Sequence, residues 1–213
     1  MSVATVDLIG VLNAKQNVSG GDRQVMSDER DNLLIAQGLP RYTEMSRRGT
    51  GWQVMNTSAL AAVVVRPSTV AGLTLWNGET AGGKSYILDR AFAHNLVGVA
   101  NSSYGIWLCL HPAGMTKPTA DITAIKGNYG LLYSGNAIVD TGATVLDNGW
   151  FPWSDAGHAV TITVPGGQII AMVEGRLIVP PQGGVSIQVV ADTTAATFTH
   201  GFHWYEERLT LAA

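Results

Sequence analysis

The sequence is poor in charge. Charged residues make up 14% of the 213 positions, whereas roughly 25% is usual for a soluble protein. The 13 Lys and Arg do not exceed the 16 Asp and Glu, so the chain lacks the positive footprint with which proteins neutralise phosphates. These shortages argue against direct nucleic-acid binding and favour a surface that another protein covers.

Cysteine and long apolar runs are also scarce. The single Cys109 lies in the run IWLCL, which predicts a buried, inert thiol and no disulfide within the monomer. The longest apolar run, 59–65, is far shorter than the ~18–20 residues that span a bilayer. The first residues contain Asp7 and have neither a basic leader nor a long apolar centre, unlike a signal peptide. We therefore expect synthesis in a cytoplasm and no membrane partner.

The charges that the chain does have are concentrated near its beginning. Six of the 13 basic and six of the 16 acidic residues fall within residues 1–50. Ser27 can cap a short helix near residues 27–37 that Gly38 ends. The apolar patch of this helix consists of Leu33, Leu34 and Ile35. We interpret residues 1–57 as an extended N-terminal arm containing one short helix.

From about residue 58 onward, short β-rich runs alternate with turn residues. In the run VSIQVVA, Val185, Ile187 and Val189 fall on one face, which is typical of a strand with one side in the core. This rhythm predicts an all-β fold, with a jelly-roll-like antiparallel β-sandwich over residues 58–213. The strands are expected near 59–66, 70–76, 85–97, 104–111, 128–133, 137–146, 159–164, 168–174, 176–180, 184–191 and 197–207.

Turn chemistry separates several of these strands. Asn77 and Gly78 are residues that adopt positive φ readily, so they predict a tight turn after the strand near 70–76. The prolines of Pro180-Pro181-Gln182-Gly183-Gly184 cannot donate to a central ladder. This run and Pro165-Gly166-Gly167 therefore predict two further turns.

Five histidines prompt a search for a metal site. His200 and His203 lie three residues apart on an expected strand, so their side chains face opposite sides. His203 and Glu207 share a face, but a metal site needs a third donor from another strand. The sequence also lacks the motif of a cupin-type enzyme, in which two histidines separated by one residue are followed by a glutamate. We expect no metal and no cofactor, and a metal-dependent jelly-roll enzyme stays as a lesser alternative.

Other catalytic signatures fail in the same way. The Gly-x-Ser-x-Gly turn of serine hydrolases does not occur. Gly82-Gly83-Lys84-Ser85 imitates the end of a phosphate loop, but the first glycine is misplaced and a β-rich segment follows where a helix is required. No carboxylate pair stands out as a glycosidase pair. We therefore expect a protein that is not an enzyme and has no small-molecule substrate.

The tryptophans include a dense aromatic loop at Asn148-Gly149-Trp150-Phe151-Pro152-Trp153. Exposed rings there would form a patch suited to protein or glycan contact. Buried rings would close one end of the sandwich. We favour burial, either in the monomer or in an assembly.

The arrangement of a charged, irregular arm before a charge-poor β body, with the run GRLIVPPQGGVSIQVVADTTAATFTHGFHWYEERL near the end, resembles the jelly-roll structural proteins of tailed bacteriophages. That group includes capsid decoration and minor capsid proteins. The resemblance spans the whole chain as architecture. It implies a virion component, a homotrimer whose arms reach neighbouring subunits and whose bodies seal gaps beside a major capsid or other virion protein.

The leading hypothesis is therefore a structural protein of a virus particle, and the alternative is a receptor- or glycan-binding sandwich from a tail tip or fibre. Deleting residues 1–50 is expected to leave a folded body that no longer joins its assembly. The expected interface residues are Leu33, Leu34, Ile35, Arg41, Tyr42, Arg47, Arg48 and Trp52 in the arm, and Trp150, Phe151 and Trp153 in the body.

Overall fold

A computed structural model describes residues 42–113, 116–119, 125–128, 130–143, 149–154, 157–158 and 167–209, without the side chains of Glu44 and His158. The chain divides into two units between Pro40 and Arg41, and the described residues all belong to the second unit. The helix expected near 27–37 lies outside the described residues.

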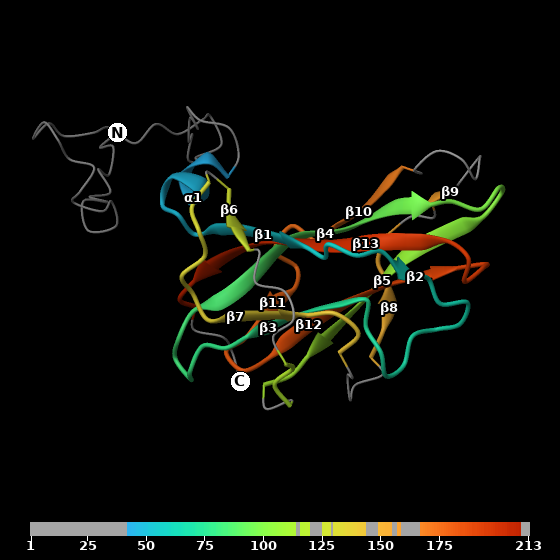
Figure 1. Cartoon of the computed structure of the whole chain (residues 1–213). Coiled ribbons are helices and arrows are strands. Elements are labelled where there is room, and N and C mark those ends of the chain that lie inside the picture. Colours follow the sequence, from blue (N-terminus) through green and yellow to red (C-terminus); the bar gives the residue numbers. More distant parts are fainter. Residues whose placement is uncertain are drawn as a thin grey trace, which may run out of the picture. The chain divides into compact units, whose positions relative to one another are not determined.

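The described residues form two antiparallel sheets that pack on each other (Figure 1). The first sheet contains β1 (Gly51–Met55), β2 (Leu60–Ala61), β4 (Ser85–Val97), β6 (Lys126–Gly127), β10 (Gln168–Met172), β11 (Ile178–Val179) and β13 (Thr197–Glu207). The second sheet contains β3 (Leu73–Asn77), β5 (Ser103–His111), β7 (Ala137–Asp140), β8 (Phe151–Pro152), β9 (Gly157–His158) and β12 (Gly184–Ala191). One helical turn, α1 (Thr43–Arg47), precedes β1, and no helix in this part of the chain has the length and hydropathy to cross a bilayer.

The strand pairs are nested like those of one long hairpin. Strand β1 pairs with β13, β3 with β12, β4 with β10 and β5 with β8, so the early strands meet the late ones in reverse order. The hairpin is rolled up, because β13 also pairs with β4 in the first sheet and β12 with β5 in the second. This is the topology of a jelly roll, and the predicted all-β, jelly-roll-like sandwich is confirmed.

Three of the four longest strands have the bounds expected from the sequence, and the fourth, β5, begins one residue earlier than expected. Strands β4, β12 and β13 have the bounds predicted from the sequence, 85–97, 184–191 and 197–207. The run expected at 59–66 forms only the two-residue β2, and the one expected at 128–133 is replaced by β6 at 126–127. The strand expected at 159–164 and the turn at Pro165 lie outside the described residues.

Strand β1 is the main correction to the predicted domain boundary. It lies in the segment assigned to the arm, yet it occupies a position between β13 and β6 in the first sheet. Tyr42, further upstream, stacks on Tyr205 of β13 with ring centroids 5.2 Å apart. The sandwich therefore includes residues 42–57, and a deletion of residues 1–50 would remove part of the packed body.

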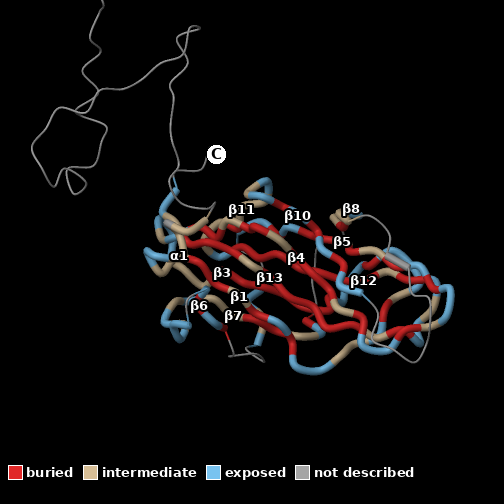
Figure 2. Tube along the Cα trace, turned by 90° about the horizontal axis from the view of Figure 1, so that it is seen from above, coloured by how far each residue is buried: buried red, intermediate tan, exposed pale blue. Residues whose placement is uncertain are grey.

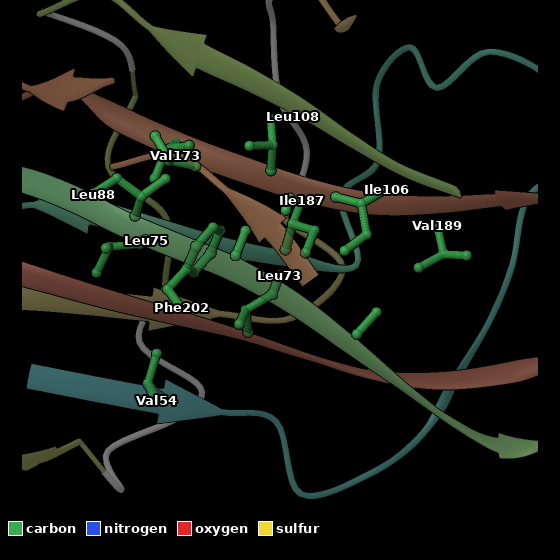
Figure 3. Close-up of a cluster of buried hydrophobic side chains, with 14 of the residues drawn as sticks. Val54, Leu73, Leu75, Leu88, Ile106, Leu108, Val173, Ile187, Val189 and Phe202 are labelled. Carbon is green, nitrogen blue, oxygen red and sulfur yellow. The ribbon is translucent and has the colours of Figure 1, made fainter. Parts of the chain in front are cut away.

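The core fills the space between the sheets (Figures 2 and 3). Leu73, Ile106 and Ile187 of the second sheet and Leu88 and Phe202 of the first are among its buried members. Because strand side chains alternate between faces, a strand such as β12 contributes every second residue. Strand β4 contributes Tyr86 and Leu88 and then Ala91 and Ala93, since its pairing with β13 shifts at Asp89. The predicted inward face of Val185, Ile187 and Val189 is confirmed, since all three are fully buried. Cys109 is buried as well, as the sequence predicted.

One turn differs from its prediction. Gln182, in the predicted Pro180–Gly184 turn, has a φ of 63°. In the loop between β3 and β4, however, Gly82 takes the left-handed conformation, with φ of 79°, rather than Asn77 or Gly78. Asn77 is instead the fully buried last residue of β3.

Two glycines in strands provide a matched test of this packing. A Cβ added at Gly201 would overlap the ring of Phe92 and lie 2.6 Å from the Val54 carbonyl oxygen, whereas one added at Gly105 meets no atom within 4 Å. Gly201→Ala should therefore lower the free energy of unfolding by about 1–3 kcal/mol. Gly105→Ala should leave it unchanged or raise it slightly. Urea unfolding followed by tryptophan fluorescence measures both, and equal effects would contradict the packing.

Candidate interaction surface

The outer face of the first sheet carries a continuous apolar row. Ile170 of β10 is registered with Phe92 of β4, Phe92 with Gly201 of β13, and Gly201 with Met55 of β1. The row therefore crosses four neighbouring strands. We call the outward side chains of these strands the sheet face.

Several of its apolar side chains are exposed in the single chain. Met55 and Met172 are each 46% exposed, Ile170 40% and Leu96 39%. Phe92 is nearly buried although it points outward, because its ring lies where a side chain at Gly201 would otherwise be. The missing side chain at Gly201 therefore keeps the middle of the row low and flat.

A shallow groove of about 430 Å³ lies on this face. Its lining includes Met55, Phe92 and Leu96 together with the polar side chains His94, Gln168 and Thr199. In the register Gln168 is opposite His94, and His94 is opposite Thr199. One side of the apolar row is therefore bordered by a glutamine, a histidine and a threonine, and the described residues that line the groove include no Asp, Glu, Lys or Arg.

The other border of the row is more polar. There Met172 is opposite Arg90, Arg90 is opposite His203, and His203 is opposite Gln53. The His203 ring packs edge-on against Phe92, with centroids 5.3 Å apart. Burial, and next the nearby Arg90 guanidinium, lower the pKa of His203 to about 4, although Asp89 acts in the opposite direction. His203 is therefore neutral at pH 7 and contributes no charge to the sheet face.

The expected aromatic loop is split between two environments. Trp150 is only 1% exposed and packs with Ala71 and Cys109 on the outer side of the second sheet. Phe151 is 65% exposed. Trp153 is partly buried, donates its indole N–H to the Met172 carbonyl oxygen at 3.1 Å and lies under the Arg176 guanidinium. The three rings therefore do not form one aromatic platform, and of the three only Phe151 is largely exposed to solvent.

The interface residues expected in the N-terminal arm also lie in different environments. Trp52 is 5% exposed and packs edge-on against Tyr133 at 4.7 Å, because β1 turns this ring into the core. Its predicted interface role is therefore not supported by its position. Tyr42 is partly buried on Tyr205, and Arg47 and Arg48 are exposed. Leu33, Leu34, Ile35 and Arg41 lie outside the described residues.

A serine and a histidine meet on the second sheet without any sequence signature. The Ser186 hydroxyl lies 2.8 Å from His111 Nε2 and 2.9 Å from the Thr74 hydroxyl. Ser186 and Thr74 are 0% exposed and His111 1%. A substrate cannot reach this serine in the folded chain, so the pair acts as a buried polar tie between β3, β5 and β12.

The described residues contain no group of three His, Cys, Asp or Glu side chains placed to hold a metal ion. His203 and Glu207, the pair considered from the sequence, both point outward from β13. His200 is fully buried on the inward side of the same strand. The opposite orientation of His200 and His203 agrees with the alternation expected of a strand.

Comparisons with known proteins do not identify a family for this chain. No protein-family model matches the chain, and neither a curated protein nor a solved structure matches it significantly.

The sheet face could not be predicted as a site from the sequence, because its apolar row joins residues from four strands that are far apart in the chain. The only local signal was the alternation of QIIAM, in which Ile169 and Ala171 are buried while Gln168, Ile170 and Met172 are exposed.

The buried His200 makes stability depend on pH. Neither ring nitrogen has a hydrogen-bond partner among the described residues, and burial lowers the pKa from 6.5 to about 4. As the pH falls from 6.5 to about 4, the unfolded chain takes up a proton that the folded chain refuses, so stability is lost over this window. The loss from His200 is on the order of 3 kcal/mol. His200→Gln should remove this contribution to the pH dependence of the free energy of unfolding. If the curves of unfolding free energy against pH run parallel for the variant and the parent, the assignment to His200 is contradicted.

Proposed function

We propose that this chain is a non-enzymatic structural protein of a virus particle, a capsid decoration or minor capsid protein that assembles with neighbouring subunits through its β body and N-terminal arm. The observation that carries the proposal is the sheet face, with an apolar row across β10, β4, β13 and β1. Exposed apolar patches rimmed by polar groups are typical of protein contact sites.

The size of the face favours an assembly with several contacts per subunit. Four strands about 4.8 Å apart and five residues long at about 3.3 Å each give a projected area of roughly 300 Å². A stable pairwise complex buries about 800 Å² on each partner. The sheet face is therefore one contact among several, as in a shell or trimer of repeated subunits, and we take its occupant to be a neighbouring copy of this chain.

The low charge of the chain supports the same proposal. Charged residues form 14% of the sequence, and the cores of permanent interfaces are depleted in charge. The jelly-roll topology agrees with the resemblance to phage structural proteins, although the same fold carries many functions. A homotrimer beside a major capsid protein, in the virion, is the form of assembly that this resemblance implies.

The assembly proposal predicts the effect of a single charge on the face. Met55→Asp or Ile170→Asp places an unpaired carboxylate in the apolar row, which should weaken self-association by about tenfold or more. Both side chains are at least 40% exposed, so folding of the single chain should be kept. Sedimentation velocity of the full chain over a concentration series measures the association.

Val65→Asp is the matched control, because Val65 is 67% exposed but lies outside the sheet face. It should assemble like the parent chain. The proposal fails if the parent sediments only as single chains, or if the face variants and Val65→Asp assemble equally well. Thermal unfolding of each variant shows that a lost assembly is not a lost fold.

A further inference from the structure

Two exposed leucines lie at the edge of the first sheet, beyond β1. Strand β6 pairs with β1 at this edge (Figure 1), and Leu132 forms a single antiparallel bridge with Lys126 of β6. Leu132 is 73% exposed, the highest value among the large apolar side chains in the described part of the chain, and Leu131 is 42% exposed. We call Lys126, Leu131 and Leu132 the Leu132 edge.

The strand register places Leu132 on the same side as the sheet face. His203 of β13 is opposite Gln53 of β1. Gln53 is in turn opposite Lys126, and Lys126 is opposite Leu132. Side chains that are directly opposite each other lie on one face of a sheet. Because His203 points outward, the exposed Leu132 continues the outer surface of the first sheet.

Hydrogen bonds fix the backbone that leads to the two leucines. The Gly127 N–H donates to the Leu131 carbonyl at 2.7 Å, and the Gly130 N–H donates to the Gly127 carbonyl at 3.0 Å. Gly130 has a φ of 91°, a conformation that glycine adopts without steric cost. The Asn128 N–H donates to the Gly51 carbonyl at 3.0 Å, which ties this turn to the start of β1.

The residue after Leu132 is anchored in the buried end of the sandwich. The Tyr133 hydroxyl donates to Glu206 Oε1 at 2.7 Å and accepts from the Ala137 N–H at 2.8 Å. Glu206 is 2% exposed, and its Oε2 accepts from the Lys84 ammonium at 3.2 Å. Because the backbone is held on both sides of Leu132 in the single chain, a contact through this side chain loses little backbone entropy.

We propose that the neighbouring copy that covers the sheet face also packs on Leu131 and Leu132. This inference rests on the proposed function. The projected area of the sheet face, roughly 300 Å², is well below the about 800 Å² that a stable contact buries on each partner. A copy seated on the sheet face therefore extends its contact past β1, where the register continues the outer surface into an apolar and preordered edge.

Cysteine alkylation of the full chain tests which side chains the neighbouring copy covers. Leu132→Cys, Met55→Cys and Val65→Cys each add one exposed thiol, whereas the native Cys109 is 1% exposed and reacts slowly with a maleimide. Where about nine in ten chains are assembled, only the remaining tenth reacts at a covered site, so alkylation becomes about tenfold slower than in diluted single chains. We expect this slowing for Leu132→Cys and Met55→Cys. Val65→Cys, which lies outside both surfaces, should react equally fast in the two states.

The outcomes separate this inference from the proposed function. If Met55→Cys is protected in the assembly and Leu132→Cys reacts at its single-chain rate, the inference is overturned and the proposed function stands. A parent chain that sediments only as single chains overturns both. Sedimentation velocity of each variant at the same concentrations gives its assembled fraction.

A charge at the same position gives a second measurement. Leu132→Asp should weaken self-association by about tenfold or more, because it places an unpaired carboxylate in the contact. Val65→Asp is again the matched control, since Val65 is 67% exposed. Equal association constants for the two variants would overturn the inference, and equal thermal unfolding shows that both remain folded.

Discussion

The pairing of β13 with β4 is the contact on which both sides of the first sheet depend. The two strands are registered from Thr197 to Glu207, and this register directs Phe202 and Trp204 into the core while Gly201 and His203 point outward. A slip by one residue would exchange the two sets. It would place the His203 imidazole in the core and the Trp204 ring on the surface, so the core and the sheet face are fixed together.

An irregularity in β4 refines this pairing. His203 is opposite Arg90 and Trp204 is opposite Leu88, so Asp89 is left without a partner in β13. The Asp89 carbonyl instead accepts from the N–H groups of Val173 and Glu174, at 2.9 and 2.7 Å. A bulge of this kind bends the strand that carries it. Here it also ties the residues that follow β10 to β4, directly after the pairing of Met172 with Arg90.

The fold was predictable because the strand signal is local. Alternation in VSIQVVA and the prolines of the Pro180–Gly184 turn marked β12 and its start from neighbouring residues alone. Strand β1 was missed because GWQVM is short and follows a charged, glycine-containing segment, and only its pairing with β13 makes it a strand. Tertiary pairing overrides weak local preference in such cases.

The surfaces were harder to predict because they are made by the register. The sequence drew attention to Trp52 and Trp150 as large aromatic groups, and both are buried by contacts with distant residues. Gly201 gave no signal as a single glycine, yet its missing side chain makes room for the Phe92 ring. The dipeptide Asn77-Gly78 predicts a turn, whereas Asn77 is the buried end of β3 and donates its side-chain amide to the carbonyls of Lys84 and of the distant Val179.

The most direct test of the assembly account is the oxidation of Met55 and Met172 by hydrogen peroxide, followed by mass spectrometry of the full chain. Both side chains are 46% exposed in the single chain, and exposed methionines oxidise readily to the sulfoxide. We expect both to be protected at concentrations where the chain is assembled and to be oxidised after dilution to single chains. Equal oxidation rates in the two states would show that the sheet face remains open in the assembly and would contradict the account.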